Sequence, residues 1–338
     1  MATDPDAPLA LPEHQPPALR DLAERARGYA EAASLANTRR AYAADWKHFA
    51  GWCRREGLEA LSPDPQVVGL YITACASGAK SVGGRKNAVS TIERRLSALV
   101  WACAQRGFSL DRRNPHVATV LAGIRNSHAA PPRQKEAILP EDLLAMLETC
   151  DRSTLRGLRD RAMLLIGFAG GLRRSEIVGL DHGKDDTPES GGWVEVLDGG
   201  ALINLRGKTG WREVEIARGS SDQTCPIHAL TQWLHYAKID FGPIFVAVSR
   251  NGLKATADCL SDKHVARLIK QTVEDAGLRP DLSKAERLAL YSGYSLRAGL
   301  ASSAEVDERY VQKQLGHAST EMTRRYRFRV NLTKAAGL

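Results

Sequence analysis

Hydrophobic residues in the first third of the chain recur at intervals of three and four, the spacing of one face of an α-helix. The first helix is predicted to begin at Asn37, because a short polar side chain at the N-cap accepts hydrogen bonds from free backbone N–H groups. The same spacing predicts helices over 65–75, 90–103 and 116–126, and the second of these opens with a Ser–Glu capping box. The apolar face of the first helix consists of Tyr42, Trp46, Phe49 and Cys53.

Helical spacing also dominates the second part of the chain. It predicts helices over 140–150 and 155–169, a helical turn at 172–177 after a Gly-Gly pair, and further helices over 226–236 and 262–277. The last of these begins with an aspartate as N-cap and ends at a glycine.

The pattern changes to alternating apolar and polar residues between two of these helices. Three short runs show it, 193–197, 201–205 and 212–216, and Gly-rich turns separate them. From these runs and turns we expect a small antiparallel sheet. The fold class predicted from the sequence is therefore mainly α with a small antiparallel β-sheet.

Segments without periodicity divide the chain. Residues 1–17 are rich in proline, alanine and acid, which is typical of a disordered leader. Residues 127–137 combine a Pro-Pro pair with charge and predict an interdomain linker. We therefore expect a helical first domain over 18–126 and a second domain over 138–338.

Charge is unevenly distributed between these two parts. The 338 residues carry a formal net charge of +8. Through Lys135 there are 19 Lys and Arg against 12 Asp and Glu, whereas the remaining residues hold 28 against 27. This asymmetry favours a first domain that grips a polyanion such as DNA, although a merely basic soluble protein would show the same excess.

Basic residues of the first domain are the candidates for contacts with DNA phosphates. Lys and Arg on a flexible loop and the adjoining helix can follow a nucleic-acid backbone without reading bases. A solvated charged face is the alternative interpretation for each one, so the cluster carries the prediction. The candidates are Arg39, Arg40, Lys80, Arg85, Lys86, Arg94 and Arg95.

Neither cysteines nor apolar runs indicate a secreted or membrane protein. The six cysteines lie far apart and form no CxxC pair, which argues against a zinc site and a disulfide framework and is consistent with a reducing cytoplasm. The longest apolar run, around 162–172, is about half the length that a membrane span requires. We expect a cytoplasmic protein that does not enter a membrane.

The stretch 291–326 holds the residues best suited to chemistry. It contains Arg297, His317 directly after Gly316, and Tyr326 nine residues after the histidine. An arginine and a histidine can hold a phosphate diester while a phenolic oxygen attacks it. Each residue taken singly has an ordinary structural interpretation, so only the set is informative.

Lys208 lies in a Gly-Lys-Thr-Gly turn between two predicted strands. The letters resemble a nucleotide-binding P-loop, but Leu202 stands where that motif requires glycine, and a strand follows instead of a helix. We therefore exclude ATP binding. A lysine at a hairpin tip can protonate a leaving alkoxide, although a simple turn lysine is the alternative.

No motif indicates a metal ion. The chain has no HExxH sequence and no clustered His and Cys. Asp185, Asp186 and Glu189 lie in a Gly- and Pro-rich loop and are expected to be solvated. A metal-dependent nuclease is disfavoured, and we expect no cofactor.

Four separated motifs make the chain resemble a tyrosine recombinase of the phage integrase family, with a Cre-like character. GLRRSE at 171–176 is similar to the first arginine box, and SLRAG around Arg297 is similar to the second. GKTG supplies the hairpin lysine, and LGH followed by Tyr326 supplies the last histidine and the nucleophile. The resemblance implies a SAM-like, helical core-binding domain in front of the catalytic domain.

The resemblance also implies a role for each matching residue. Arg173 and Arg297 would hold the scissile phosphate, with Glu176 as the supporting acid. Tyr326 would attack the phosphorus and form a 3′-phosphotyrosine, and Lys208 would protonate the departing 5′-oxygen. The last residue of the set, His317, would donate a hydrogen bond to the phosphate.

The implied partners are double-stranded DNA with an inverted-repeat target site and further copies of the chain. Members of the family recombine two DNA sites as a homotetramer through a Holliday junction. The segment after Tyr326 would be the tail exchanged with a neighbouring subunit.

Two departures from the family pattern leave alternatives open. Tyr294 stands three residues before Arg297, where the family has histidine, and the interval from Arg297 to His317 is about three residues short. A phenol is a poor proton acceptor at neutral pH. These departures leave open a catalytically impaired DNA-binding protein of the same fold. A type IB topoisomerase-like nicking and closing enzyme is a second alternative, because it shares the same catalytic set.

Overall fold

The computed structural model describes Leu22, Arg25 and the ranges 36–61, 64–128, 130, 135–184, 190–207, 210–303 and 308–316. The chain divides into two units, Met1–Pro132 and Arg133–Leu338, each with its own hydrophobic core. The point of division lies inside the segment that the sequence predicts as a linker. The predicted leader lies outside the described residues.

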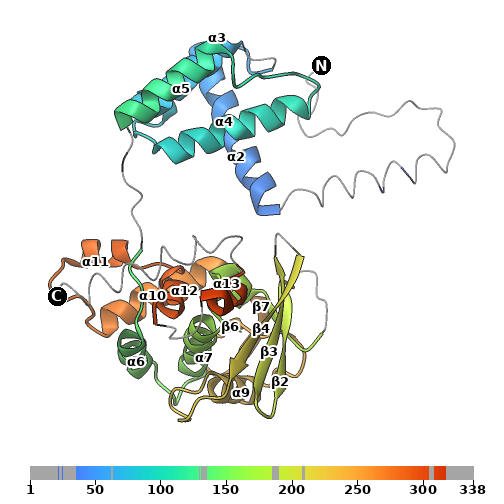
Figure 1. The fold of residues 1–338 in the computed structure, drawn as a ribbon, viewed down its shortest axis with the longest axis vertical. Helices are drawn as coiled ribbons and strands as arrows, with labels where there is room; N and C mark the ends of the chain where they lie inside the picture. Colours follow the sequence, from blue (N-terminus) through green and yellow to red (C-terminus); the bar gives the residue numbers. More distant parts are fainter. Residues whose placement is uncertain are drawn as a thin grey trace. The chain divides into compact units, whose positions relative to one another are not determined.

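The first unit is built from helices that cross one another (Figure 1). Within its described residues the regular secondary structure is entirely helical, as the hydrophobic spacing predicts. Its elements are α2 (Ala36–Glu56), α3 (Pro65–Ser77), the 3₁₀ turn η1 (Lys80–Val82), α4 (Val89–Ala104) and α5 (Pro115–His128).

Local signals explain some of these helix boundaries and fail at others. Asp64 caps α3, since its Oδ1 accepts from the backbone N–H of Gln66 at 2.8 Å. The predicted capping box of α4 is wrong: Ala88 is the N-cap and makes no side-chain cap bond. The carboxylate of Glu93 instead accepts from Arg125 on α5 at 2.7 Å. Asn37 lies inside α2, not at its N-cap.

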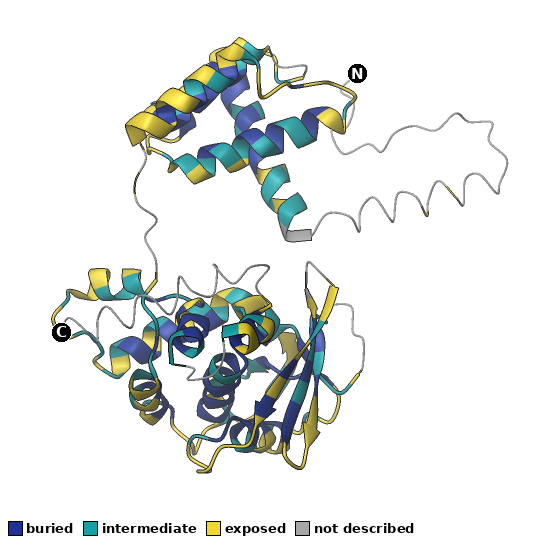
Figure 2. Ribbon diagram, in the orientation of Figure 1, coloured by how far each residue is buried: buried dark blue, intermediate teal, exposed yellow. Residues whose placement is uncertain are grey.

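The core of the first unit uses the predicted apolar face of α2. Phe49 and Cys53 are fully buried, and the ring of Phe49 meets the ring of Tyr71 edge to face at a centroid distance of 5.0 Å. Leu96 and Leu99 of α4 belong to the same core. Figure 2 shows buried positions along the crossing helices of this unit. Burial of these side chains is what holds the crossing helices together.

The described part of the second unit combines helices with a five-stranded sheet and a separate two-stranded one. In Figure 1 the larger sheet lies on one side of this unit and most of the helices lie on the other. The helices are α6 (Pro140–Glu148), α7 (Leu155–Ala169), α8 (Arg174–Val178), α9 (Pro226–Ala237), α10 (Asp262–Asp275), α11 (Lys284–Leu290), α12 (Ser295–Ser303) and α13 (Glu308–Leu315).

The sheet has the strand order β4-β3-β2-β1-β5, and β6 and β7 form a separate pair. The three predicted strands are confirmed as neighbouring antiparallel strands, whereas β1 pairs in parallel with β2. The strands are β1 (Leu180–His182), β2 (Gly192–Leu197), β3 (Gly200–Gly207), β4 (Gly210–Ala217), β5 (Gly242–Pro243), β6 (Val246–Val248) and β7 (Ala255–Cys259).

Helix α7 occupies the centre of the second unit. Thr154 caps it by accepting from the backbone N–H of Gly157 at 3.1 Å, and most residues of its last three turns are buried. Helix α9 packs against it, and Trp233 of α9 donates from Nε1 to the Ile244 carbonyl at 2.8 Å. Across the described ranges, no helix combines the length and the apolar composition of a membrane span.

Candidate active site

The first arginine box begins at a tight turn after α7. Gly171 has φ of 57°, a left-handed conformation that favours glycine. A Cβ at this position would lie 2.5 Å from Cδ2 of Leu315, so any side chain here would force Leu315 to move. The turn therefore brings the arginine box directly against the end of α13, two residues before His317.

Arg173 is held at the start of α8 by Glu176. The Glu176 carboxylate accepts from the backbone N–H of Arg173 at 2.8 Å and from its Nη1 at 2.6 Å. A glutamate three residues into a helix can bond back to the N-cap in this way. The Arg173 side chain remains 38% exposed, so its guanidinium can reach a ligand in solvent.

Glu176 also binds Arg212 of β4, which the sequence reasoning missed. Arg212 Nη2 lies 2.8 Å from Glu176 Oε2. Burial disfavours the charged carboxylate, but the Arg212 charge and the hydrogen bonds from Arg173 outweigh it, so the pKa of Glu176 lies below its ordinary value. One signal could have found Arg212: it occupies an inward position of an alternating strand, where an arginine needs a buried partner.

Arg297, in the second arginine box, is only 1% exposed. Its Nη1 donates to the Gly171 carbonyl at 2.7 Å, and its Nη2 donates to the Leu315 carbonyl. The guanidinium thus connects the turn of the first box with the last residue of α13. Three of the four motifs that the sequence singles out meet at this side chain.

The glycine of SLRAG has a steric role. A Cβ at Gly299 would lie 1.9 Å from the Ile138 carbonyl oxygen and 2.8 Å from the ring of Phe168. Only glycine lets α12 approach the start of α6 and the end of α7 this closely. This packing fixes the depth at which Arg297 is buried.

Helix α13 is docked on β4. The Gln314 side chain donates to the Glu215 carbonyl at 3.0 Å, and Arg212 donates to the Gln314 carbonyl. Gly316, with φ of 58°, ends the helix as the sequence predicts. His317, the next residue, is outside the described residues.

The remaining members of the predicted catalytic set are Lys208, Tyr326 and Tyr294. Lys208 and Tyr326 lie outside the described residues, but Gly207 and Gly210 on either side of the lysine turn are paired, as a hairpin requires. Tyr294 is exposed, and a Cβ at its neighbour Gly293 would lie 2.9 Å from Cδ of Arg174 in the first box. The structure therefore brings Arg173, Glu176 and Arg297 together, with Tyr294 at the edge of the same region.

The predicted DNA-contacting residues of the first unit differ in their surroundings. Lys80, Arg85 and Lys86 are exposed on η1 and the loop after it, and Arg40 is exposed on α2 while Arg39 is half-buried. Their exposure is compatible with phosphate contacts. Arg94 is also exposed but forms an ion pair with Asp45.

Arg95 is held inside the first unit. Its side chain is 13% exposed, and its Nη1 lies 3.2 Å from His48 Nδ1 and 3.1 Å from Cys75 Sγ. Burial and the Arg95 charge lower the pKa of His48. Because this guanidinium connects α2, α3 and α4, we expect a structural role for it in place of the phosphate contact that the sequence suggests.

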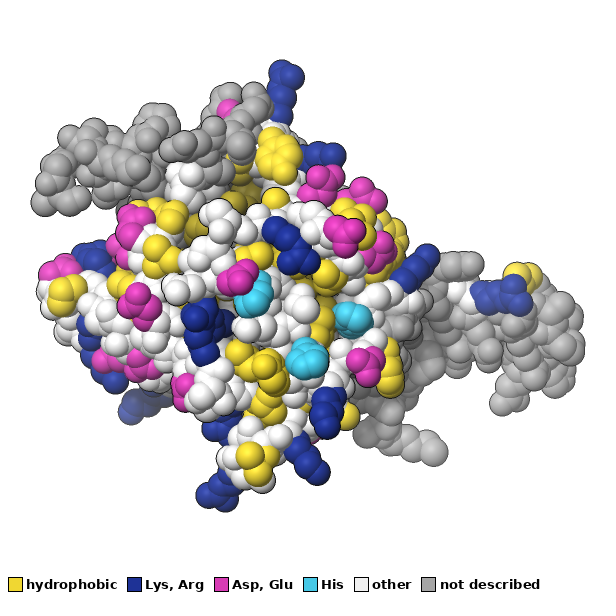
Figure 3. Space-filling model, turned by 90° about the horizontal axis from the view of Figure 1, so that it is seen from below, with side chains coloured by type: hydrophobic (Ala, Val, Ile, Leu, Met, Phe, Trp, Pro, Cys, Tyr) yellow, Lys and Arg dark blue, Asp and Glu magenta, His cyan; other side chains and the backbone are white. Residues whose placement is uncertain are grey.

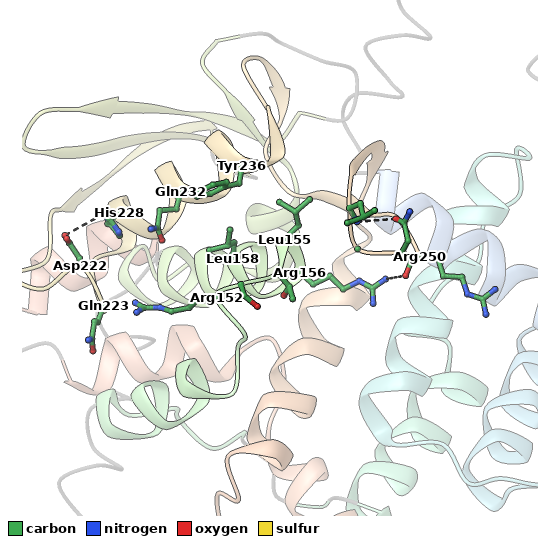
Figure 4. A pocket seen from close by; sticks show the side chains of 15 residues that line it. Arg152, Leu155, Arg156, Leu158, Asp222, Gln223, His228, Gln232, Tyr236 and Arg250 are labelled. Atoms are coloured by element: carbon green, nitrogen blue, oxygen red, sulfur yellow. Dashed lines mark hydrogen bonds and ion pairs between the residues drawn. The ribbon is translucent and has the colours of Figure 1, made fainter.

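A hollow lined by arginines lies elsewhere in the second unit (Figure 4). Arg156 donates to the Ser249 carbonyl at 3.0 Å, and Asp222 lies 3.7 Å from the ring of His228. None of the described members of the predicted catalytic set, Arg173, Glu176, Tyr294 and Arg297, lines it. Figure 3, seen from below, shows acidic, basic and His side chains mixed with hydrophobic ones, which is unlike the positive face that DNA requires.

Metal chemistry has no visible site in the described part of the chain. There, no group of three or more His, Cys, Asp and Glu side chains could hold a metal ion. The charges that converge at the candidate site are instead guanidinium groups and one carboxylate. Such an arrangement can bind and stabilise a phosphate that gains negative charge.

Comparison with known proteins identifies the family. The model of the phage integrase family matches residues 136–330. An integrase/recombinase xerD homolog of Selenomonas ruminantium is 32% identical over 329 residues, which cover 93% of this chain and 87% of that protein. The tyrosine recombinase XerC 2 of Ralstonia nicotianae is 25% identical over 304 residues, covering 86% and 76%.

Two solved structures share the fold. The XerH site-specific recombinase bound to palindromic difH substrate aligns with a TM-score of 0.51 and 18% identity, over 82% of this chain and 72% of that one. A lambda integrase dimer bound to a core site aligns with a TM-score of 0.53 and 15% identity, over 93% and 81%.

The relatives decide between the interpretations of the sequence. They carry recombinase and integrase names, which favours neither a non-catalytic DNA-binding protein nor a topoisomerase. Their XerC and XerD names do not confirm a Cre-like character. The chain therefore belongs to the phage integrase family, and it is an enzyme of the tyrosine recombinase type.

Proposed function

We propose that this enzyme recombines specific DNA sites through a 3′-phosphotyrosine intermediate in the cytoplasm. Tyr326 attacks the scissile phosphorus, the bond to the 5′-oxygen breaks as the new bond forms, and Lys208 gives the leaving oxygen a proton. Arg173, Arg297 and His317 hold the non-bridging oxygens. The 5′-hydroxyl of a partner strand then reverses the step.

One observation carries this proposal: Arg297 binds both the Gly171 turn and the end of α13. It places the first arginine box beside the segment that continues to His317. The assembly that follows is a homotetramer on two inverted-repeat sites, which resolves through a Holliday junction. DNA phosphates outside the cleavage point are bound by Lys80, Arg85 and Lys86, together with Arg39 and Arg40.

Covalent trapping tests the proposal. The full chain is incubated with a library of nicked duplexes in EDTA, and protein-linked strands are isolated and sequenced. We expect adducts on one inverted-repeat sequence for the natural chain and for Tyr310→Phe, which removes an exposed phenol of α13. Tyr326→Phe is expected to give none. Adducts that survive Tyr326→Phe, or that need a divalent metal, would contradict the mechanism.

Tyr294 allows a second test of the same site. Its exposed phenol can donate a hydrogen bond but is a poor proton acceptor at neutral pH. We expect Tyr294→His to raise the rate of adduct formation on the nicked substrate, about tenfold for a working proton acceptor. Tyr294→Phe is the control, and an equal rate in all three proteins would show that this position takes no part.

A further inference from the structure

Two tryptophans form an exposed aromatic pair on the sheet of the second unit. The rings of Trp193 on β2 and Trp211 on β4 meet edge to face, with centroids 5.2 Å apart. Trp211 is 58% exposed, which is unusual for the largest apolar side chain. The pair borders a hollow of about 680 Å³.

Strand register explains why polar groups surround these rings. Trp193 lies opposite Asn204, and Asn204 lies opposite Glu213, so the three side chains form a row across β2, β3 and β4. Trp211 is two residues before Glu213 and therefore shares its face. The hollow thus offers a ring for stacking beside one amide and one carboxylate, groups that can hydrogen-bond the edge of a nucleobase.

Two lysines add positive charge to the same hollow. Lys184 Nζ lies 5.5 Å from the centre of the Trp193 ring, and Lys313 reaches the hollow from α13. Both side chains are exposed. Ammonium groups beside an aromatic ring are the combination that binds single-stranded nucleic acid, because they serve the phosphates while the ring stacks on a base.

Arg212 is shared between the hollow and the candidate active site. This residue is part of the lining of the hollow, and its guanidinium, on the inward face of β4, pairs with Glu176, the residue that holds Arg173. Trp211 also lies three residues after Lys208, on the strand that follows the lysine turn. A DNA strand held at the arginines would therefore have its neighbouring nucleotides near the rings.

We propose that this hollow binds an unstacked base of the DNA strand next to the cleavage point, by stacking it on Trp211. The inference rests on the proposed function, since it assumes that DNA reaches the arginine site. A cleaved strand must leave its helix before it can join a partner, and a base held outside the stack would keep the freed end from closing back. Stacking on one aromatic residue changes affinity by about 5- to 150-fold.

Base-dependent binding by the full chain tests this inference. Anisotropy is measured with two labelled oligonucleotides of eight nucleotides, one of thymidines and one abasic with the same phosphates. We expect the natural chain to bind the thymidine strand about tenfold more tightly. Trp211→Ala should lose this preference, and Trp211→Phe should keep most of it.

A matched control separates stacking from a general loss of exposed aromatic surface. Phe241→Ala removes another exposed ring of the second unit, and it should leave the preference unchanged. An equal affinity for both oligonucleotides in the natural chain would overturn the inference, as would a preference that survives Trp211→Ala. A hollow that instead contacts a neighbouring subunit would show the first of these results.

The outcome is independent of the test of the main proposal. Neither oligonucleotide contains a duplex site, so binding does not require Tyr326. Adducts on nicked DNA without a base preference would refute the aromatic site alone. A base preference without adducts would refute the cleavage mechanism and leave the binding site in place.

Discussion

The two arginines proposed to hold the same phosphate are themselves held in opposite ways. Arg173 is 38% exposed and pairs with a carboxylate, whereas Arg297 is 1% exposed and binds two main-chain carbonyls. A guanidinium has five N–H donors, so each can serve the protein with some and a ligand with others. The two arginines therefore differ in how much stability the protein would lose if the side chain were removed.

Arg297 connects segments that are far apart in the sequence, since Gly171 and Leu315 belong to different ends of the second unit. Arg173 is attached locally, three residues from its partner Glu176. A buried arginine that joins distant segments, here called a connector, contributes both to stability and to catalysis. A locally attached, exposed arginine can contribute to catalysis without contributing to stability. Four substitutions separate these contributions, and their expected effects on stability decrease in turn.

The largest effect is expected for Arg297→Leu. It leaves the carbonyls of Gly171 and Leu315 without their donor in a buried place, and each unsatisfied acceptor costs about 1–3 kcal/mol. We expect the free energy of unfolding, measured with urea, to fall by about 4 kcal/mol in total. Arg174→Leu is the control, because that exposed arginine forms a surface ion pair with Asp262. Equal losses would show that Arg297 is no connector.

The next effect is expected for Glu176→Gln, and it depends on pH. The folded pKa of Glu176 lies below its ordinary value, so its contribution is complete above the unfolded pKa and disappears as the pH falls through the folded one. We expect a loss of about 3 kcal/mol at pH 7, because two arginines lose a charged partner.

Urea unfolding at several pH values checks the assignment to Glu176. The difference between the natural chain and Glu176→Gln should shrink as the pH falls below the ordinary pKa of a glutamate, about 4.3, because the unfolded state then takes up a proton first. It should disappear only below the folded pKa, where the carboxylate is protonated in both states. Glu286→Gln is the control: that exposed carboxylate caps α11, and its replacement should give a smaller stability difference than Glu176→Gln at every pH. A stability difference that stays constant with pH would show that the lost stability does not come from the charge of Glu176.

A smaller effect is expected for Gly171→Ala. The added Cβ meets Leu315 at 2.5 Å and Leu300 at 2.8 Å, and φ is positive. We expect a loss of about 2 kcal/mol from crowding and backbone strain together. Gly252→Ala isolates the strain, because its φ is 79° but nothing lies within 4 Å of its Cβ. If both variants lose the same stability, the contact between the first box and α13 contributes nothing.

The sequence predicts a helix or strand correctly where the residues that form it also carry the pattern that marks it. The helix over 155–169 is confirmed with the same bounds, because an apolar face and a capping threonine both mark it. The strands β1 and β5 were missed, since they have three and two residues and pair with distant partners. Strands of that length carry no period of their own.

The same distinction applies to the candidate site. The motifs identified Arg173 and Arg297, but nothing local to either predicts that one is exposed and the other buried. That depends on Gly171 and Leu315, which tertiary packing places beside Arg297. Arg212 was missed for the same reason, because its partner Glu176 lies 36 residues away. The sequence shows the type of each side chain, but it does not show which distant residue that side chain will contact.

The smallest effect on stability is expected for Arg173→Ala, which separates the two arginines most clearly. Glu176 keeps Arg212 and the backbone N–H of residue 173 as partners, so no buried charge is left unpaired. We expect a loss below about 1 kcal/mol, as for an exposed ion pair. Adduct formation should fall at least about 100-fold, because a donor to the developing charge on the phosphate is removed. If Arg173→Ala instead destabilises the protein as much as Arg297→Leu, both guanidiniums are connectors. The exposure of Arg173 would then be no argument that it binds the phosphate.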